Sequence, residues 1–241
     1  MRESWKPHLY VAAPCAAILA TAAWGFTRKA CYPYADATGE QVCPGDRNQL
    51  QTISEMVART SYTAELSIVG MRAALRTIIS KRQGIGPEDA EIANTAFAIG
   101  AAGLIGLTVW SMRVSGDIHN GFTVQTLSML LVISYIVKEE GTLGQLLFAG
   151  EVAALAAYAV LYMTAHRPPP DPVEYFKFKY HYHAVAQITF LVLYHGLIWR
   201  AYRKAMKGSD EKATESGALA GHMGNPQDSM NRHGYSQLHW T

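Results

Sequence analysis

The chain has 241 residues, a formal net charge of +2 and 49% hydrophobic residues. This near-neutral charge, with no dense basic run, argues against a nucleic-acid partner. Three cysteines are too few for a disulfide scaffold, and the apolar stretches take up so much of the chain that no room is left for a soluble catalytic domain.

Six apolar stretches approach the roughly 20 helical residues that are needed to cross a bilayer. Because lipid offers the backbone no hydrogen-bond partner, each spanning stretch must be helical. We therefore expect an all-α fold: a polytopic membrane protein with a bundle of six transmembrane helices within residues 1–207. The expected spans are residues 9–27, 53–71, 92–112, 122–137, 143–163 and 184–202.

The loop that follows the first expected span contains two of the cysteines, Cys31 and Cys43. Its composition, rich in Pro, Gly, Asp and Asn, is typical of turns rather than of a packed core. If the loop faces an oxidising lumen, the two cysteines can form a disulfide. The alternative is two free thiols.

Four charged residues fall within the second and fifth stretches. Glu55 and Arg59 are four residues apart and can pair on one helix face. Glu65 and Glu151 fall near mid-membrane, where an ionised carboxylate is costly. These four residues form a candidate intramembrane polar site. It is either a structural contact between helices or a site for a lipid headgroup, an ion or a proton.

The third stretch has Gly100, Gly103 and Gly106 at intervals of three along one helix face. Small residues allow two membrane helices to approach closely. We interpret this stripe as a helix-packing surface.

The histidines do not predict a metal site. His181 and His183 point to different faces of a helix, and His195 has no histidine four residues further on. No nucleophile motif of the Gly-x-Ser-x-Gly type occurs. We therefore expect neither catalytic residues, nor metal, nor cofactor.

Lysines and arginines near the span ends are more numerous on the side that holds both chain termini. This asymmetry places both termini in the cytosol, and an even number of spans also requires them to share a side. Residues 208–241 are polar and rich in Gly, Ser and Asn, and we expect them to form a disordered cytosolic tail.

Several short sequence motifs, called boxes here, occur in an order that resembles the order found in the DRAM-type six-span family (damage-regulated autophagy modulators and their FRAG- and SFK-like relatives). The segment after the first span is similar to the family's luminal Pro-Tyr-Ile-Ser-Asp-Thr-Gly box. The glycine stripe, the start of the fourth helix and the start of the last helix also resemble family boxes. The matching residues are Tyr32, Pro33, Tyr34, Asp36, Thr38, Gly39, Arg72, Gly100, Gly103, Gly106, His119, Gly121 and His183.

The resemblance implies a non-enzymatic, multi-pass protein of the lysosome, other endomembranes or the plasma membrane. Such a protein would contact membrane lipids and modulate autophagy, lysosomal or plasma-membrane lipid-linked processes through protein partners in the membrane or cytosol. One alternative is a participant in the remodelling of GPI anchors or other lipids. A further alternative is an accessory subunit of a larger membrane assembly, such as a respiratory complex.

Overall fold

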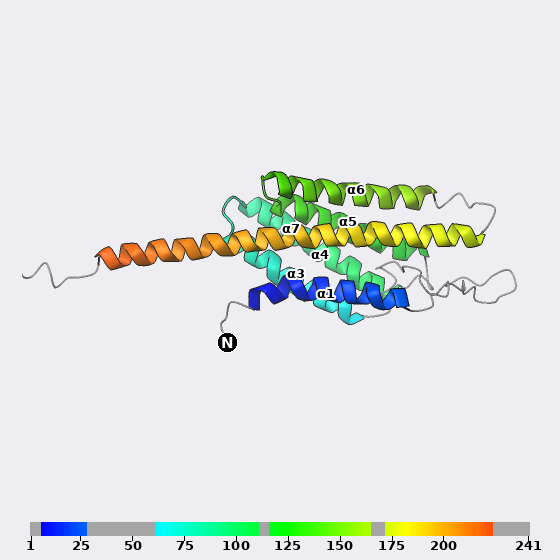
Figure 1. The fold of residues 1–241 in the computed structure, drawn as a ribbon, viewed down its shortest axis with the longest axis horizontal. Coiled ribbons are helices and arrows are strands. Elements are labelled where there is room, and N and C mark those ends of the chain that lie inside the picture. Colours follow the sequence, from blue (N-terminus) through cyan, green and yellow to red (C-terminus); the bar gives the residue numbers. More distant parts are fainter. Residues whose placement is uncertain (1–5, 28–60, 111–115, 165–171, 224–241) are drawn as a thin grey trace, which may run out of the picture.

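The computed structural model describes residues 6–27, 61–110, 116–164 and 172–223. All regular structure in these ranges is helical, as expected. The helices run side by side in one bundle (Figure 1). They are α1 (Lys6–Thr27), α3 (Ser61–Lys81), α4 (Pro87–Val109), α5 (Gly116–Val137), α6 (Thr142–Thr164) and α7 (Pro172–Met223).

Four helices in the described ranges are long and apolar enough to cross a membrane. They are α4, α5 from Ile118, α6 as far as Leu161, and the Tyr182–Gly208 part of α7. Helix α1 has a shorter apolar core, Val11–Ala20. The length and composition of these helices indicate a membrane-embedded protein.

Short turns make neighbouring helices antiparallel. Between α3 and α4, Gly84 adopts a φ of +91°, a conformation that glycine reaches without the clash a Cβ would cause. Helix α4 then begins at Pro87, with Glu88 and Asp89 in its first turn. Proline fits the first helical position, and the two carboxylates face the positive end of the helix dipole.

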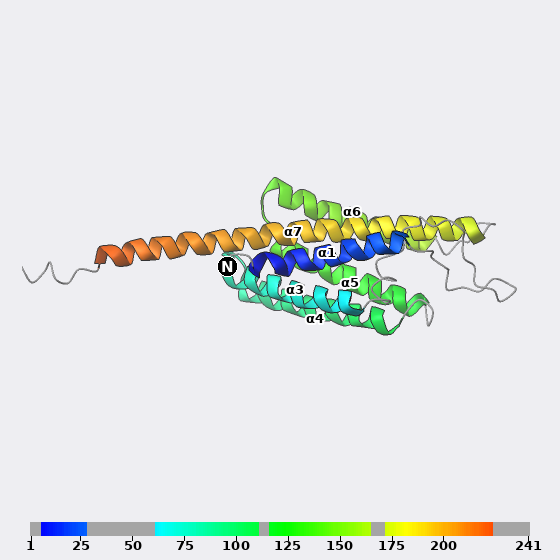
Figure 2. The ribbon, with the colours of Figure 1, turned by 60° about the horizontal axis from the view of Figure 1, so that its bottom comes forward.

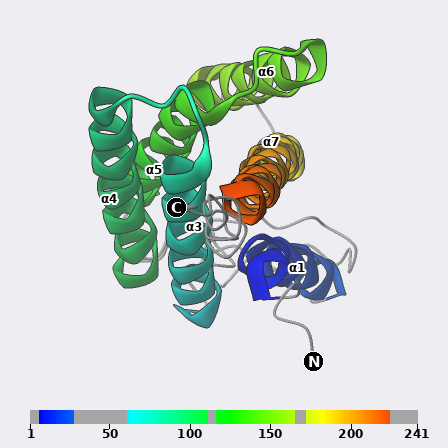
Figure 3. The ribbon, with the colours of Figure 1, turned by 90° about the vertical axis from the view of Figure 1, so that its left-hand side faces the viewer.

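Helix α7 is the central element of the bundle. It packs against α6, α3, α5 and α1, and the end-on view shows it between α6 and α1 (Figure 3). Its Phe190, Tyr194 and Tyr202 side chains are almost completely buried. The hydrophobic core is therefore organised around this one helix.

The glycine stripe lies where α4 packs against α5. A Cβ at Gly103 would clash with Oγ1 of Thr126, and one at Gly106 would lie 2.6 Å from ring atoms of Phe122. Only a residue without a side chain permits this spacing, which is the packing role that the sequence spacing predicts.

Helices α3 and α7 differ most in extent from the expected spans. Helix α3 continues to Lys81, ten residues past the expected end at residue 71, because Ala74, Leu75 and Ile78 continue the buried face at helical spacing. The first part of that expected span, residues 53–60, lies outside the described residues.

Helix α7 begins at Pro172 and ends only at Met223, so residues 208–223 are helical rather than disordered. The segment contains helix-forming Lys, Glu and Ala residues. It also extends a helix that already exists, which avoids the cost of nucleation. Residues 224–241 of the expected tail lie outside the described residues.

The start of α1, the α3–α4 turn, the α5–α6 turn and the C-terminal part of α7 lie at the same end of the bundle (Figure 1). We call this the basic end, after Lys81, Arg82, Lys138, Arg200, Arg203, Lys204 and Lys207. Helix α7 extends well past the other helices at this end in two views (Figures 1 and 2).

Candidate functional site

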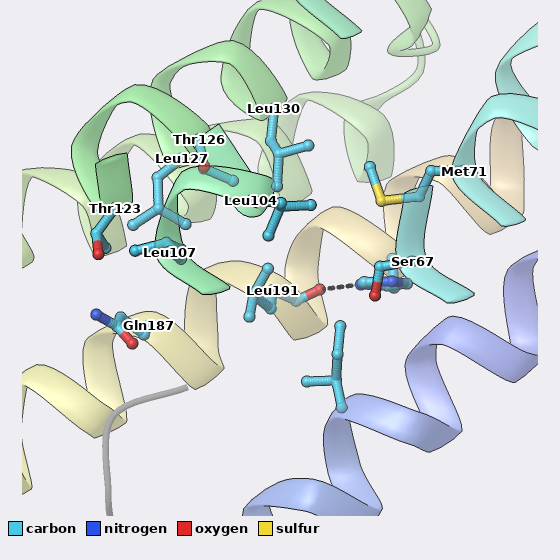
Figure 4. A pocket seen from close by; sticks show the side chains of 12 residues that line it. Ser67, Met71, Leu104, Leu107, Thr123, Thr126, Leu127, Leu130, Gln187 and Leu191 are labelled. Atoms are coloured by element: carbon cyan, nitrogen blue, oxygen red, sulfur yellow. Dashed lines mark hydrogen bonds between the residues drawn. The ribbon is translucent and has the colours of Figure 1, made fainter. Parts of the chain in front are cut away.

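A cavity of about 50 Å³ lies inside the bundle, between α1, α3, α4, α5 and α7. Figure 4 shows leucines of α4 and α5 on one wall and Leu191 of α7 facing them. The apolar lining residues are Ile18, Met71, Leu104, Leu107, Leu127, Leu130 and Leu191. The polar lining residues are Ser67, Thr123, Thr126, Gln187 and His195.

Among the described residues that line the cavity, His195 is the one ionisable side chain. Its side chain is 6% exposed, and Nδ1 lies 2.7 Å from the carbonyl oxygen of Leu191, the bond that is drawn as a dashed line in Figure 4. Because a carbonyl oxygen only accepts, Nδ1 must carry the proton in this bond. The neutral ring then presents a lone pair at Nε2, which has no hydrogen-bond partner among the described residues.

The two threonines of the lining donate their hydroxyl protons to backbone carbonyls. Oγ1 of Thr123 donates to the His119 carbonyl at 3.1 Å, and Oγ1 of Thr126 donates to the Gly100 carbonyl at 3.5 Å. Each hydroxyl oxygen keeps its capacity to accept a hydrogen bond. The accessible surface of the cavity is nevertheless almost entirely apolar.

Glu151 lies on α6 and is fully buried. Ser134 of α5 and Tyr194 of α7 are its polar neighbours. The Ser134 hydroxyl faces the carboxyl group but does not reach hydrogen-bond geometry, and neither carboxyl oxygen has a partner among the described residues. Glu151 is thus a buried acid at the junction of α5, α6 and α7.

The candidate intramembrane polar site is not assembled as the sequence suggested. Glu151 is buried in the interior, whereas the Glu65 side chain is exposed on the surface of α3. Helix α3 directs Ala64 and Ser67 inward, and this rotation turns Glu65 away from the core. Glu55 and Arg59 lie outside the described residues.

The family-like residues that the structure describes are dispersed. Nδ1 of His119 lies 3.0 Å from the carbonyl oxygen of Trp110, and the His183 ring packs 5.0 Å from the Tyr158 ring. Arg72 and Gly121 are exposed. The described residues include no group of three or more His, Cys, Asp or Glu side chains placed to hold a metal ion.

The remaining family-like box and the proposed disulfide fall in ranges that the structure does not describe. They are Tyr32, Pro33, Tyr34, Asp36, Thr38, Gly39, Cys31 and Cys43.

The basic end holds polar contacts that tie three helices together. Arg82, just after α3, donates to the carbonyl oxygens of Val137 and Lys138, the latter at 2.8 Å. Arg200 of α7 pairs with Glu139 at 2.9 Å. The two Arg82 bonds satisfy backbone carbonyls that the end of α5 leaves without partners inside the helix.

Lys138 lies over an aromatic ring at this end, with Nζ 3.4 Å from the centre of the Tyr135 ring. Such a position favours the cation. Desolvation acts in the opposite direction and lowers the pKa of Lys138 from its ordinary value.

Sequence reasoning considered His195 only as a possible metal ligand and did not single out the cavity residues Ser67 and Gln187. One signal was present: Gln187, Leu191 and His195 follow one another at intervals of four on α7, so two polar groups share one face of an apolar helix. What the sequence does not reveal is that this face opens onto a cavity shared with four other helices.

Comparison of the chain with family models, curated proteins and solved structures finds no match. The resemblance to the DRAM-type family therefore depends on the ordered sequence boxes alone.

Proposed function

We propose that this chain is a non-enzymatic, multi-pass membrane protein that crosses the bilayer six times. It modulates lysosomal, endomembrane or plasma-membrane lipid-linked processes through protein partners. The observation that carries the proposal is the single helix α7, which joins the centre of the membrane bundle to an extension beyond it.

The dimensions of α7 support a part outside the membrane. Its 52 residues correspond to about 78 Å of helix, at 1.5 Å per residue. A bilayer core is about 30 Å thick. More than half of α7 must therefore lie in the headgroup layer or in water.

The position of the basic residues supports a cytosolic location for the extension. Arg203, Lys204 and Lys207 are exposed where α7 leaves the bundle, and Lys and Arg accumulate on the cytosolic side of membrane proteins. The extension, residues 209–223, then lies in the cytosol, where it offers a helical surface to a partner.

One observation supports six spans rather than four. Helices α1 and α3 pack against each other and against α7, alongside helices that are long and apolar enough to span a membrane. The start of α1 and the extension of α7 lie at a common end of the bundle (Figure 1), which agrees with any even number of crossings.

A truncation tests the role of the extension. Removal of residues 209–241 is expected to leave the bundle folded and resistant to extraction from membranes by alkaline carbonate, because the described core residues of α7 lie at or before Met206. The same truncation is expected to remove the protein partners that co-purify with the full chain from cross-linked cells. A control truncation removes only residues 224–241.

Organelle imaging of the full chain with a fluorescent tag completes the test. Localisation to lysosomes, endomembranes or the plasma membrane supports the proposal. Mitochondrial localisation, together with comigration with a respiratory complex on native gels, contradicts it and favours the accessory-subunit alternative. An unchanged set of partners after the 209–241 truncation contradicts the role given to α7.

A further inference from the structure

We infer that the outer face of α3 is an interface within the membrane, where Arg72 pairs with a carboxylate on a transmembrane helix of a partner protein. The inference rests on the six-span placement proposed above, and it adds a partner of stated chemistry to that proposal. The feature that carries it is an exposed arginine in the middle of a bundle helix.

Arg72 lies close to the midpoint of α3. It is nine residues before Lys81 and eleven after Ser61, the bounds of the helix, or about 14 Å and about 17 Å along the axis. The end of α3 is level with the end of α5, because Arg82 donates to the carbonyl oxygen of Lys138. In a hydrocarbon core about 30 Å thick, Arg72 is therefore near the centre, beyond the reach of lipid phosphates at either surface.

No helix in the described part of the chain covers the Arg72 side chain. Helix α3 packs against α1, α7 and α4, and the end-on view shows it between α4 and α1 (Figure 3). Its buried face contains Ala74, Leu75 and Ile78. Arg72 is exposed on another face and forms no hydrogen bond or ion pair with a described residue. Because charged side chains within membranes almost always face protein or water, we expect a further protein surface over Arg72.

The chemistry of arginine selects the group on that surface. A guanidinium keeps its charge in proteins and offers five N–H donors. A carboxylate neutralises this charge and accepts two parallel hydrogen bonds from it, whereas a neutral amide leaves the charge uncompensated. The occupant is therefore a neighbouring helix with an acidic residue at mid-membrane depth.

A second copy of this chain does not meet that requirement. Copies related by a two-fold axis along the membrane normal place each residue at one depth, so Arg72 would face Arg72. Among the described acids, Glu151 lies at a similar depth, nine residues after Thr142, but it is fully buried in its own bundle. Glu65 is exposed, but it is seven residues, or about 10 Å along the helix, from Arg72. The partner is therefore a different protein.

The experiment uses the full chain in phosphatidylcholine vesicles and three synthetic transmembrane peptides. Each peptide is a leucine–alanine helix whose central residue is glutamate, glutamine or leucine. Association is measured by energy transfer from a donor on Gly208→Cys, with the native cysteines replaced by serine, to an acceptor on the peptide. The glutamate peptide is expected to bind about tenfold more tightly than the other two, as expected for one charge-assisted pair.

Two variants of α3 locate the interaction. Arg72→Leu is expected to remove the preference for the glutamate peptide. The matched control is Arg76→Leu, because Arg76 is exposed on the same face but lies one turn nearer the basic end, where its side chain can extend to the headgroups. Arg76→Leu should retain the preference.

A separate measurement tests whether α3 lies in the bilayer. Val69, three residues before Arg72, is 64% exposed. In the same serine background, Val69→Cys is treated with a water-soluble maleimide on both sides of the vesicles, without peptide. We expect no labelling, because hydrocarbon excludes the reagent. Rapid labelling contradicts the six-span placement, and the inference fails with it.

With Val69→Cys unlabelled, the remaining outcomes concern the inference alone. It fails if the three peptides bind equally, or if Arg72→Leu keeps the preference of wild type. It also fails if Arg76→Leu loses as much preference as Arg72→Leu. Energy transfer between two copies of the chain that disappears in Arg72→Leu identifies a second copy as the occupant and overturns the inference. Loss of the preference in phosphatidylserine vesicles shows that lipid phosphates reach Arg72, which also overturns it.

Discussion

At the scale of single residues, the helices satisfy some of their buried and part-buried polar groups locally. Thr77, Thr123 and His195 each donate to the carbonyl oxygen four residues earlier. This arrangement suits a membrane bundle, because the bond needs no partner from another helix or from water. It is available only to side chains that donate a proton.

Glu151 shows the limit of that arrangement. An ionised carboxyl group only accepts, so the carbonyls of its own helix cannot stabilise it. Its polar neighbours, Ser134 and Tyr194, come from other helices. Whether an intramembrane acid is tolerated therefore depends on the packing of α5 and α7 against α6.

The glycine stripe yields a prediction at this scale. Gly103→Leu is expected to destabilise the bundle by about 1–3 kcal/mol, as overpacking does, because the new side chain meets Thr126 and the backbone oxygen of Phe122 at 3.2 Å. The measurement is the unfolding midpoint in a titration with sodium dodecyl sulfate.

The matched control is Gly121→Ala. A Cβ at Gly121 has no atom within 4 Å, so the change should be neutral or slightly stabilising through the better helix propensity of alanine. If Gly103→Leu is no more destabilising than Gly121→Ala, the close approach of α4 and α5 is wrong.

At the scale of helices and turns, the basic end stabilises the connection between α5 and α6. The end of α5 leaves carbonyl groups without intrahelical partners, and Arg82 donates to two of them. Arg200 adds an ion pair with Glu139, whose side chain is only 11% exposed. The short turn between α5 and α6 is thereby attached to both α3 and α7.

Loss of this attachment is expected to lower the stability of the protein measurably. Arg82→Ala should lower the free energy of unfolding by about 2 kcal/mol, since two charge-assisted hydrogen bonds are lost. Arg82→Lys should restore only part of it, because an ammonium lacks the forked geometry of a guanidinium. Thermal unfolding in detergent provides the measurement.

Arg76→Ala is the control, because Arg76 is exposed on α3, the helix that Arg82 follows. Surface substitutions away from specific contacts usually change stability by less than about 0.5 kcal/mol. Equal effects of Arg76→Ala and Arg82→Ala would contradict the capping role of Arg82.

At the scale of the whole molecule, the number of crossings decides how the protein faces its partners. Among the described residues, four helices are both long and apolar enough to span a membrane, and α1 and α3 make the proposed number six. With six crossings, the segment around Asp36 lies opposite the α3–α4 turn and Gly208. With four crossings and α1 and α3 on the surface, Asp36 lies on the same side as both.

Cysteine labelling distinguishes these arrangements. In a background with Cys15, Cys31 and Cys43 replaced by serine, single substitutions Asp36→Cys, Gln83→Cys and Gly208→Cys are treated with a membrane-impermeant maleimide on sealed vesicles. The six-span topology predicts that Gln83→Cys and Gly208→Cys label alike and Asp36→Cys labels oppositely. Labelling of all three on one side contradicts it.

The sequence by itself determined the all-helical, membrane-embedded character of this protein, because a chain in lipid must satisfy its backbone within each helix. It also located the glycine stripe, since a spacing of three residues is visible along a single helix. These properties depend on neighbours in the chain.

Only the tertiary structure decided which polar residues share a site. Glu65 and Glu151 looked equivalent in the sequence, yet the rotation of α3 exposes one and the packing of α6 buries the other. The cavity beside His195 likewise requires residues from five helices. Contacts between distant segments depend on how helices rotate and pack, and the local pattern of one helix does not specify this.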